Sequence, residues 1–300
     1  MTFSVAIPTY NRPEALSLCL KSILDQSLLP DEILIIDDGY LDNQFVDTLR
    51  DKVEKVLPSF VYYQKNQTLE RRGLAESKNI ALKKASGEII FFLDDDLVLA
   101  QGFFKSIMKI WQEKQTDQKL IGVAGVISNN RWPGKVEKIY NQVFNLTSKK
   151  DWDITPVGFQ VWNDQLDHVS EGHYAHGGVV SLRRVEASNF GFSVFGGGRT
   201  GLEDVDFCWR VKKRDFYFII EPAARTDHYH SQETREKEYL SGQKESQNRI
   251  EIFGVQGEKG MKARGLFFWS MLGWVLRQFL AGHFTKGLGM LRGLFKGVLS

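Results

Sequence analysis

Five aspartates in two clusters are the side chains of this sequence best suited to chemistry. Asp37 and Asp38 end the apolar segment EILIIDDG, and Asp94, Asp95 and Asp96 end the segment EIIFFLDDD. Adjacent carboxylates repel one another, so a positive charge has to offset them. Oxygen ligands of this kind suit Mg²⁺ or Mn²⁺. Alternate side chains of an extended segment point the same way, so we expect Asp94 and Asp96 to face one site.

Basic residues lie close enough in sequence to offset a phosphate. Arg71, Arg72 and Lys78 fall around the start of the helix expected over LAESKNIALKKASG. A divalent cation on a diphosphate, together with such side chains, would stabilise the charge that develops when the diphosphate leaves. The alternative is a set of solvated turn aspartates, since a D-x-D pattern often occurs by chance. Two clusters after two apolar strands make that alternative less favoured.

The elements that position these residues alternate between strands and helices. The predicted strands are FSVAIPTY, EILIIDDG, FVYYQKN and EIIFFLDDD, joined by helical patterns such as RPEALSLCLKSILDQ. Strands this apolar predict an α/β fold with a mostly parallel sheet covered by helices on both faces. Such sheets bind ligands beyond the carboxyl ends of their strands, so we expect both acidic clusters on one rim, facing one crevice.

The second half of the chain is less regular. HGGVVSLRR (176–184) predicts a glycine turn into a strand, and the glycine-rich SVFGGGRTG precedes a helix that opens with Glu203 and Asp204. FYFIIEP and ARTDHYH predict two further strands. Cys19 and Cys208 fit reduced core positions of a cytosolic chain, and the first residues do not have the pattern of a secretory signal.

Together these segments resemble an inverting family-two glycosyltransferase with the GT-A fold, a Rossmann-like mixed sheet flanked by helices. The resemblance covers residues 3–230. SVAIPTYNRPEALSLCLKSILDQSLLPDEILIIDDG resembles the opening of that family, and RRGLAESKNIALKKASGEIIFFLDDD resembles the stretch that ends in its D-x-D motif. GLEDVDFCWR resembles its ED motif. The order and spacing of these motifs make the resemblance specific.

The resemblance implies a role for each matching residue. The donor-binding residues would be Thr9, Tyr10, Asp37, Asp38, Lys78, Asp94 and Asp95. The metal ligands would be Asp96 and His228, with His230 as the less favoured neighbour. Asp204 would be the catalytic base. The acceptor-side residues would be Gly177, Gly178, Glu203 and Trp209.

Plainer interpretations stay open for some of these residues. Asp204 could cap its helix, His228 could be a hydrogen-bonded strand residue, and Gly177 with Gly178 could form a simple tight turn. The helix N-terminus favours ionised Asp204, whereas burial would raise its basicity. Asp206 and a following arginine four positions on are expected to form a supporting ion pair.

The sequence also departs from the family pattern. Lys78 stands where the family often has arginine, which keeps the charge and loses the bidentate fork. The segment DDGYLDN lacks the common serine after its glycine. The QxxRW motif of processive synthases is missing, which argues against a polysaccharide polymerase.

The last part of the chain differs in charge from the rest. Residues 259–300 carry seven Lys or Arg and no Asp or Glu, which leaves 32 basic against 37 acidic groups in residues 1–258. The apolar run 265–276 is shorter than a bilayer span requires. We therefore expect a catalytic domain over residues 1–245 and a basic amphipathic helical tail over residues 246–300. Residues 260–300 would lie on the membrane surface.

Other roles for the tail remain open: a strained span over residues 265–284, a helical flap packed on the catalytic domain, or a dimer contact. Nucleic acid is not an expected partner, because no recognition motif accompanies the basic charge.

The implied function is a metal-dependent, inverting transfer from a nucleoside-diphosphate sugar, by default a UDP-sugar, to a hydroxyl of a glycan or lipid-linked acceptor in cell-envelope polysaccharide synthesis. The protein would be cytoplasmic and peripherally bound to the inner face of the membrane. One rival is a nucleotidyltransferase, but its glycine-rich phosphate loop is missing from PTYNRPEA. Another is a noncatalytic nucleotide-sugar-binding protein anchored at the membrane, which would bind without turnover.

Overall fold

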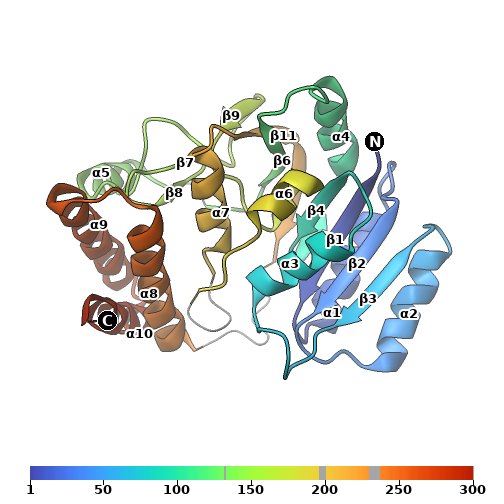
Figure 1. The fold of residues 1–300 in the computed structure, drawn as a ribbon, viewed down its shortest axis with the longest axis horizontal. Helices are drawn as coiled ribbons and strands as arrows, with labels where there is room; N and C mark the ends of the chain where they lie inside the picture. The colour runs from blue at the N-terminus through green and yellow to red at the C-terminus, as the bar shows by residue number, and fades with distance from the viewer. Residues whose placement is uncertain (132, 196–200, 230–236, 300) are drawn as a thin grey trace.

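The computed structural model describes residues 1–299 except 132, 196–200 and 230–236. A large mixed sheet with helices on both faces fills one part of the molecule, and a group of C-terminal helices stands beside it (Figure 1). Most of the predicted glycine-rich loop before Glu203, and His230, lie outside the described residues.

The sheet has the strand order β3-β2-β1-β4-β10-β6-β11-β5, with β9 paired to β11. Its strands are β1 (Phe3–Thr9), β2 (Glu32–Asp37), β3 (Phe60–Gln64), β4 (Ile89–Leu93), β5 (Leu97–Leu99), β6 (Leu120–Ile127), β9 (Ser170–Gly172), β10 (Val179–Arg183) and β11 (Tyr217–His228). The first four strands of this order run parallel, and β10 is inserted antiparallel between β4 and β6. A separate antiparallel pair joins β7 (Asp153–Ile154) to β8 (Gln160–Val161).

One strand prediction is wrong. FYFIIEP and ARTDHYH do not form two strands, because β11 runs without a break from Tyr217 to His228. Its pairing with β6 shifts register between Ile220 and Arg225. Pro222 lies in this interval and has no N–H to donate, so the ladder is interrupted there while the chain stays extended.

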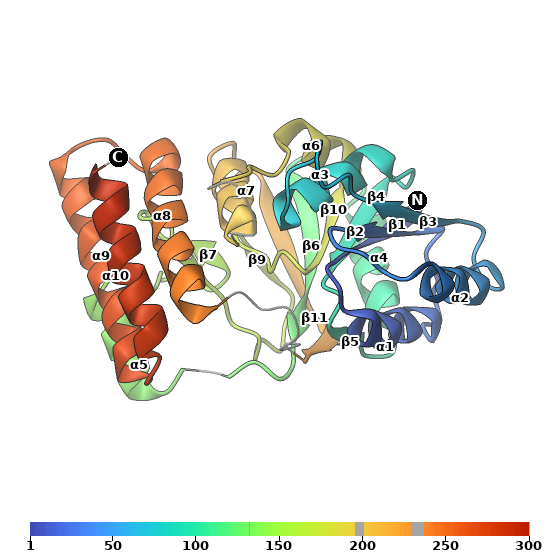
Figure 2. The same cartoon turned by 90° about the horizontal axis from the view of Figure 1, so that it is seen from below.

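Both faces of the sheet are buried, as predicted. Along β1, Val5 and Ile7 enter one hydrophobic core and Ala6 enters the other, which follows from the alternation of side chains in a strand. The first core is covered by α1 (Pro13–Leu24), α2 (Asn43–Glu54) and α4 (Phe103–Glu113). The second is covered by α3 (Leu74–Lys84), α6 (Arg184–Phe190) and α7 (Glu203–Lys212) (Figure 2).

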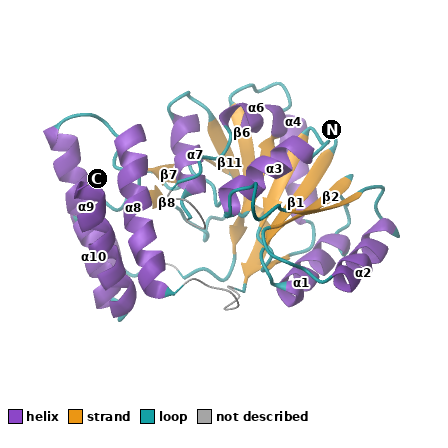
Figure 3. Ribbon diagram, turned by 60° about the horizontal axis from the view of Figure 1, so that its bottom comes forward, coloured by secondary structure: helices purple, strands orange, loops and turns teal. Residues whose placement is uncertain are grey.

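The remaining helices gather at the side of the sheet away from α1 and α2 (Figure 3). They are α5 (Lys135–Val143), α8 (Glu238–Gln256), α9 (Met261–Leu280) and α10 (Phe284–Leu299). α9 is fastened to α5, because the hydroxyl of Tyr140 donates to the Gly273 carbonyl at 2.6 Å and the indole N–H of Trp269 donates to the Val143 carbonyl at 2.7 Å. The helical segment is therefore packed on the rest of the chain.

In the described part of the chain, every helix is too short or too polar to cross a bilayer, so the expected alternative of a span over 265–284 is not supported. α9 ends at Leu280, and Gly282 turns the chain with φ +81° before α10. α8 runs through residues 245 and 246. The division into a catalytic domain and a tail stays a prediction, and the stated boundary lies inside this helix.

Candidate active site

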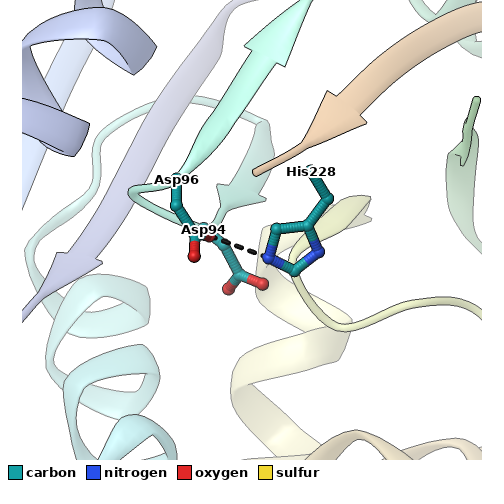
Figure 4. A group of neighbouring side chains, drawn as sticks. All are labelled: Asp94, Asp96 and His228. Atoms are coloured by element: carbon teal, nitrogen blue, oxygen red, sulfur yellow. Dashed lines mark ion pairs between the residues drawn. The ribbon is translucent and has the colours of Figure 1, made fainter. Parts of the chain in front are cut away.

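The side chains of Asp94, Asp96 and His228 converge beyond the end of β4 (Figure 4). Asp94 and Asp96 follow β4 directly, and β5 then pairs antiparallel with β11, which sets His228 opposite Leu97. One ligand atom from each of the three side chains lies within 4.8 Å of the others, and His228 Nε2 is 2.8 Å from Asp96 Oδ1. Two carboxylates and an imidazole could hold a divalent metal ion such as Mn²⁺.

The ends of three parallel strands share one rim. Thr9, the last residue of β1, is in register with Asp37, the last residue of β2. The hydroxyl of Thr9 also donates to Asp95 Oδ2 at 2.7 Å, across to the residues that follow β4. Tyr10 comes next in the chain and is half-buried. The predicted arrangement of both acidic clusters along one rim is therefore present.

Asp95 is held by protein groups. Besides Thr9, Arg12 reaches it, with its guanidinium 3.0 Å from Asp95 Oδ1 and 3.5 Å from Asp96 Oδ2. Burial raises the pKa of Asp95 to about 6, against the hydrogen bond from Thr9 and the charge of Arg12, which both lower it. Arg12 is not among the site residues predicted from the sequence. Its position directly after the first strand, on the predicted rim, was the available signal.

The carboxylate of Asp37 is fully engaged in organising its own loop. It accepts hydrogen bonds from the backbone N–H of Gly39 at 2.7 Å and of Leu41 at 2.9 Å. The hydroxyl of Tyr62 on β3 donates a third at 2.8 Å. A buried carboxylate with three protein donors is a structural support for the loop after β2.

Asp38 has a different set of partners. Lys65 Nζ lies 2.7 Å from Asp38 Oδ1, and both side chains are buried. The backbone N–H of Gly73 donates to Asp38 Oδ2 at 2.8 Å, which ties the start of α3 to the end of β2. Sequence analysis did not single out Lys65, and a lysine at the end of a strand carries no local signal of this role.

Lys78 and Glu203 form a buried ion pair in the middle of the site. Lys78 Nζ is 2.7 Å from Glu203 Oε1, which joins α3 to the first turn of α7. Burial alone would lower the pKa of Lys78, but the charges of Glu203, Asp204 and Asp94 outweigh it, and the pKa is raised. Burial also raises the pKa of Glu203, and Lys78 acts in the opposite direction. Lys78 therefore stays charged among carboxylates.

Asp204 lies in the first turn of α7 and is half-buried, and its Oδ1 accepts the backbone N–H of Val205 at 2.8 Å. The buried hydroxyl of Tyr174 donates to Asp204 Oδ2 at 3.1 Å. Burial, and then the charge of Asp204, raise the pKa of Tyr174 well above its usual value, so this hydroxyl keeps its proton. Leu202, just before the helix, has φ +79°, a left-handed conformation that is strained for leucine. Tyr174, three positions before Gly177, is not among the site residues predicted from the sequence.

Gly177 and Gly178 lie between Asp204, the candidate base, and Asp94, a candidate metal ligand. A Cβ on Gly177 would lie 2.7 Å from Asp204 Cβ and 2.8 Å from Lys78 Nζ. A Cβ on Gly178 would lie 2.2 Å from Asp94 Cγ, and the Gly178 carbonyl accepts the Asp94 N–H at 3.1 Å. Any side chain here would separate these groups, so the glycine pair permits their close approach.

Trp209 lies apart from these residues. It is five positions after Asp204, or about 140° around the helix, and its indole is buried below Gly158. Its acceptor-side role stays a prediction. The expected ion pair between Asp206 and Arg210 is confirmed at 2.7 Å.

Comparison with known proteins agrees with this arrangement. Residues 4–164, more than half of the chain, match the glycosyl transferase family 2. The chain is 34% identical over 108 residues to the GalNAc(5)-diNAcBac-PP-undecaprenol beta-1,3-glucosyltransferase of Campylobacter jejuni, which covers 35% of this chain and 33% of that protein. It is 30% identical over 163 residues to the poly(ribitol-phosphate) beta-N-acetylglucosaminyltransferase TarS of Staphylococcus aureus, covering 52% of this chain and 27% of that one.

Solved structures share the fold. The mannosyltransferase PcManGT from Pyrobaculum calidifontis, in complex with GDP-Man and Mn²⁺, superposes with a TM-score of 0.61 at 14% identity over 99% of this chain and 86% of that chain. TarS residues 1–349 in complex with UDP-GlcNAc superpose with a TM-score of 0.54 at 16% identity over 89% and 70% of the two chains.

These matches define a GT-A fold, as the sequence predicted. The chain belongs to glycosyl transferase family 2. The sequence matches span only about a third or less of the two curated relatives.

Proposed function

We propose that the chain is an inverting, metal-dependent glycosyltransferase that moves a sugar from a nucleoside-diphosphate sugar, by preference a UDP-sugar, to a hydroxyl of a glycan acceptor. The observation that carries the proposal is the convergence of Asp94, Asp96 and His228 with Asp204, through the close approach of Gly177 and Gly178. Family membership supports the activity, and TarS was solved with UDP-GlcNAc.

In the proposed step, the acceptor oxygen forms a bond to the anomeric carbon while the bond from that carbon to the diphosphate oxygen breaks. The acceptor proton passes to the carboxylate of Asp204, and the electron pair leaves with the nucleoside diphosphate. A divalent cation held by Asp94, Asp96 and His228 would supply positive charge to the diphosphate. Tyr174 orients Asp204, and attack opposite the leaving group inverts the anomeric configuration.

The proposed donor site lies along the strand ends. Thr9, Tyr10, Asp37 and Asp38 would form the nucleoside side, with Asp37 acting through the loop that it organises. Lys78 would add positive charge near the diphosphate, since the charges of Glu203, Asp204 and Asp94 raise its pKa and keep it protonated.

The acceptor proposed for this chain carries phosphate and is lipid-linked, as part of cell-envelope polysaccharide synthesis. The Campylobacter relative is named for a diphosphoundecaprenol-linked acceptor. On α9, Phe268, Leu272 and Leu276 recur every four residues and are exposed, and residues 259–300 carry seven basic and no acidic side chains. This combination supports peripheral binding to the anionic inner face of the membrane.

The test of catalysis uses the full chain with Mn²⁺ and a panel of nucleotide sugars, and measures release of the nucleoside diphosphate. We expect Asp204→Asn to lower the rate by about 10²–10⁴-fold, as loss of a general base does. Asp167→Asn is the matched control, because that carboxylate is fully exposed and remote from these contacts. Unchanged rates in both Asp204→Asn and Asp96→Ala would contradict the proposal, and donor binding without turnover would favour a noncatalytic binding protein.

The test of membrane binding is cosedimentation with phosphatidylglycerol–phosphatidylcholine vesicles. Replacing Phe268, Leu272 and Leu276 together by serine should lower the bound fraction at least about tenfold, since three apolar side chains no longer enter the interface. Val185→Ser removes an exposed apolar side chain on α6, outside the C-terminal helices, and should have no effect. Equal binding by the triple variant would show that this face of α9 is not the contact.

A further inference from the structure

A cavity of about 460 Å³ lies between α5, α9 and the segment around β8, outside the carboxylate rim. Its size is typical of a small-molecule site. None of the side chains assigned above to donor binding, metal binding or catalysis lines it.

Aromatic rings form part of its walls. Trp162 and Trp274 both line the cavity and are half-buried. Trp274 is fixed in place, because its indole N–H donates to Glu245 Oε1 at 2.7 Å and the guanidiniums of Arg249 and Arg277 lie 5.2 Å and 5.3 Å from its ring centre. The ring of Trp274 is therefore already in contact with two cations, and Trp162 is the ring that a ligand can use. Rigid indole faces in a cavity suit the apolar face of a sugar ring, which leaves the sugar hydroxyls to polar groups.

A polar group in the wall lacks a hydrogen-bond partner. The side-chain oxygen of Asn141, on α5, is buried and accepts no hydrogen bond from the described residues. Leaving a buried acceptor unsatisfied costs about 1–3 kcal/mol, so this oxygen favours a ligand that brings a hydroxyl or N–H donor.

Charged side chains lie around the same cavity. Arg131, Lys138 and Arg277 face Glu137 and Asp151, an excess of one positive charge. Glu137 bridges two of the cations, with Arg131 at 3.4 Å and Arg277 as its other partner. The Arg131 side chain is 87% exposed and that of Arg277 36% exposed, so both can turn toward a phosphate in solvent.

The cavity is linked to the proposed base by direct contacts. The ring of Trp162 is centred 6.3 Å from that of Tyr174, whose hydroxyl bonds Asp204. On the outer side, α5 exposes Val136, Ile139 and Val143, and it is fastened to α9, which carries the exposed apolar face described above. The cavity therefore lies between the reacting centre and the proposed membrane surface.

We propose that this cavity is an acceptor subsite for a lipid-linked saccharide diphosphate. The saccharide unit next to the reacting one lies against Trp162, Asn141 accepts a hydrogen bond from one of its hydroxyls, and Arg131 and Arg277 bind the diphosphate. This inference rests on the proposed function and names the acceptor class of that same site.

The experiment measures binding of a di-N-acetylglucosaminyl diphosphate on a short isoprenyl chain, which carries a reacting unit and the unit next to it, to the full protein by calorimetry. Donor hydrolysis in water is measured in parallel. We expect Gln142→Trp, which fills the cavity from an exposed position on α5, and Asn141→Leu to weaken probe binding at least tenfold. Gln112→Trp, on the exposed side of α4, is the matched control. Donor hydrolysis should stay the same in all three variants.

The affinity of the Glu137→Gln variant for the probe tests the role of Arg131 and Arg277 most directly. It releases Arg131 and Arg277 from a competing carboxylate, so the probe should bind about threefold more tightly. Loss or no change of affinity in this variant would overturn the role of the two arginines. A cavity with a purely structural role predicts no gain.

The remaining outcomes separate the hypotheses. Equal probe affinity in wild type, Gln142→Trp and Asn141→Leu would overturn the cavity assignment. Equally tight binding of free N-acetylglucosamine 1-phosphate or of a ribitol phosphate oligomer would overturn the lipid-linked class. Probe binding that depends on the cavity, without turnover of any nucleotide sugar, would support the cavity and overturn the proposed function.

Discussion

The two acidic clusters at the ends of β2 and β4 look alike in sequence and differ in their partners. The carboxylate of Asp37 accepts three hydrogen bonds from its own loop and from Tyr62, and it is completely buried. Asp94 and Asp96 instead converge with the imidazole of His228 in a set that could hold a metal. Protein donors already bind the carboxylates of the first cluster. The second cluster concentrates negative charge that a cation would neutralise.

This difference separates a structural role from a ligand-binding role. A strand-end position brings a carboxylate to the rim, but the donors that reach it decide what remains for a ligand. Asp204 is intermediate, since Tyr174 and the Val205 backbone N–H each donate to one of its oxygens while the residue is half-buried. We therefore expect changes at the metal-ligand cluster, at Asp37 and at the contact of Tyr174 with Asp204 to have different effects on activity and stability.

The largest expected effect is on activity, from Asp96→Ala. Loss of a metal ligand should lower metal-dependent sugar transfer at least about 100-fold, beyond the 10–100-fold typical of outer-shell partners. The free energy of unfolding without metal should change little, because relief of the repulsion with Asp94 and Asp95 offsets the lost contacts to His228 and Arg12. Thermal unfolding with and without Mn²⁺, alongside activity, checks this. If Mn²⁺ raised the melting temperature of Asp96→Ala as much as that of the wild type, Asp96 would not be a metal ligand, and the two clusters would not differ in role.

The next effect is on stability, from Asp37→Asn. The amide cannot accept all three hydrogen bonds, so we expect the free energy of unfolding to fall by about 2–3 kcal/mol in urea denaturation. Asp25→Asn is the matched control, because that carboxylate is exposed and pairs with Lys21 on the surface of α1. It should change stability by less than about 0.5 kcal/mol. If Asp37→Asn leaves stability unchanged and abolishes donor binding, the carboxylate acts on the donor directly.

The smallest effect is expected from Tyr174→Phe, which removes one hydrogen bond to Asp204. We expect kcat to fall about tenfold with an unchanged KM for the donor, because a bond to a charged group is lost and the donor site is untouched. Tyr217→Phe breaks a similar bond to Asp117 at a distance from the site and should leave kcat unchanged. A rise in donor KM with constant kcat would contradict a positioning role for Tyr174.

The helical group beside the sheet shows the limits of prediction from the sequence. Its basic charge and its apolar run are visible in the composition of residues 259–300. The contact of α9 with α5 is not, since Tyr140 and Gly273 are 133 positions apart. The cavity between these helices, and its link through Trp162 to Tyr174, follow from such long-range contacts and carry no local signal.

The sequence by itself determined the alternation of apolar strands and helices, the placement of both acidic clusters at strand ends, and the family. These features follow from short-range periodicity and from motifs that each occupy a few neighbouring residues. Only the tertiary structure decided which carboxylates the protein satisfies. Their partners come from far along the chain, as with Tyr62 for Asp37, 25 positions away, and Gly73 for Asp38, 35 positions away. A local sequence pattern cannot predict hydrogen-bond donors that reach a side chain only after the strands have paired.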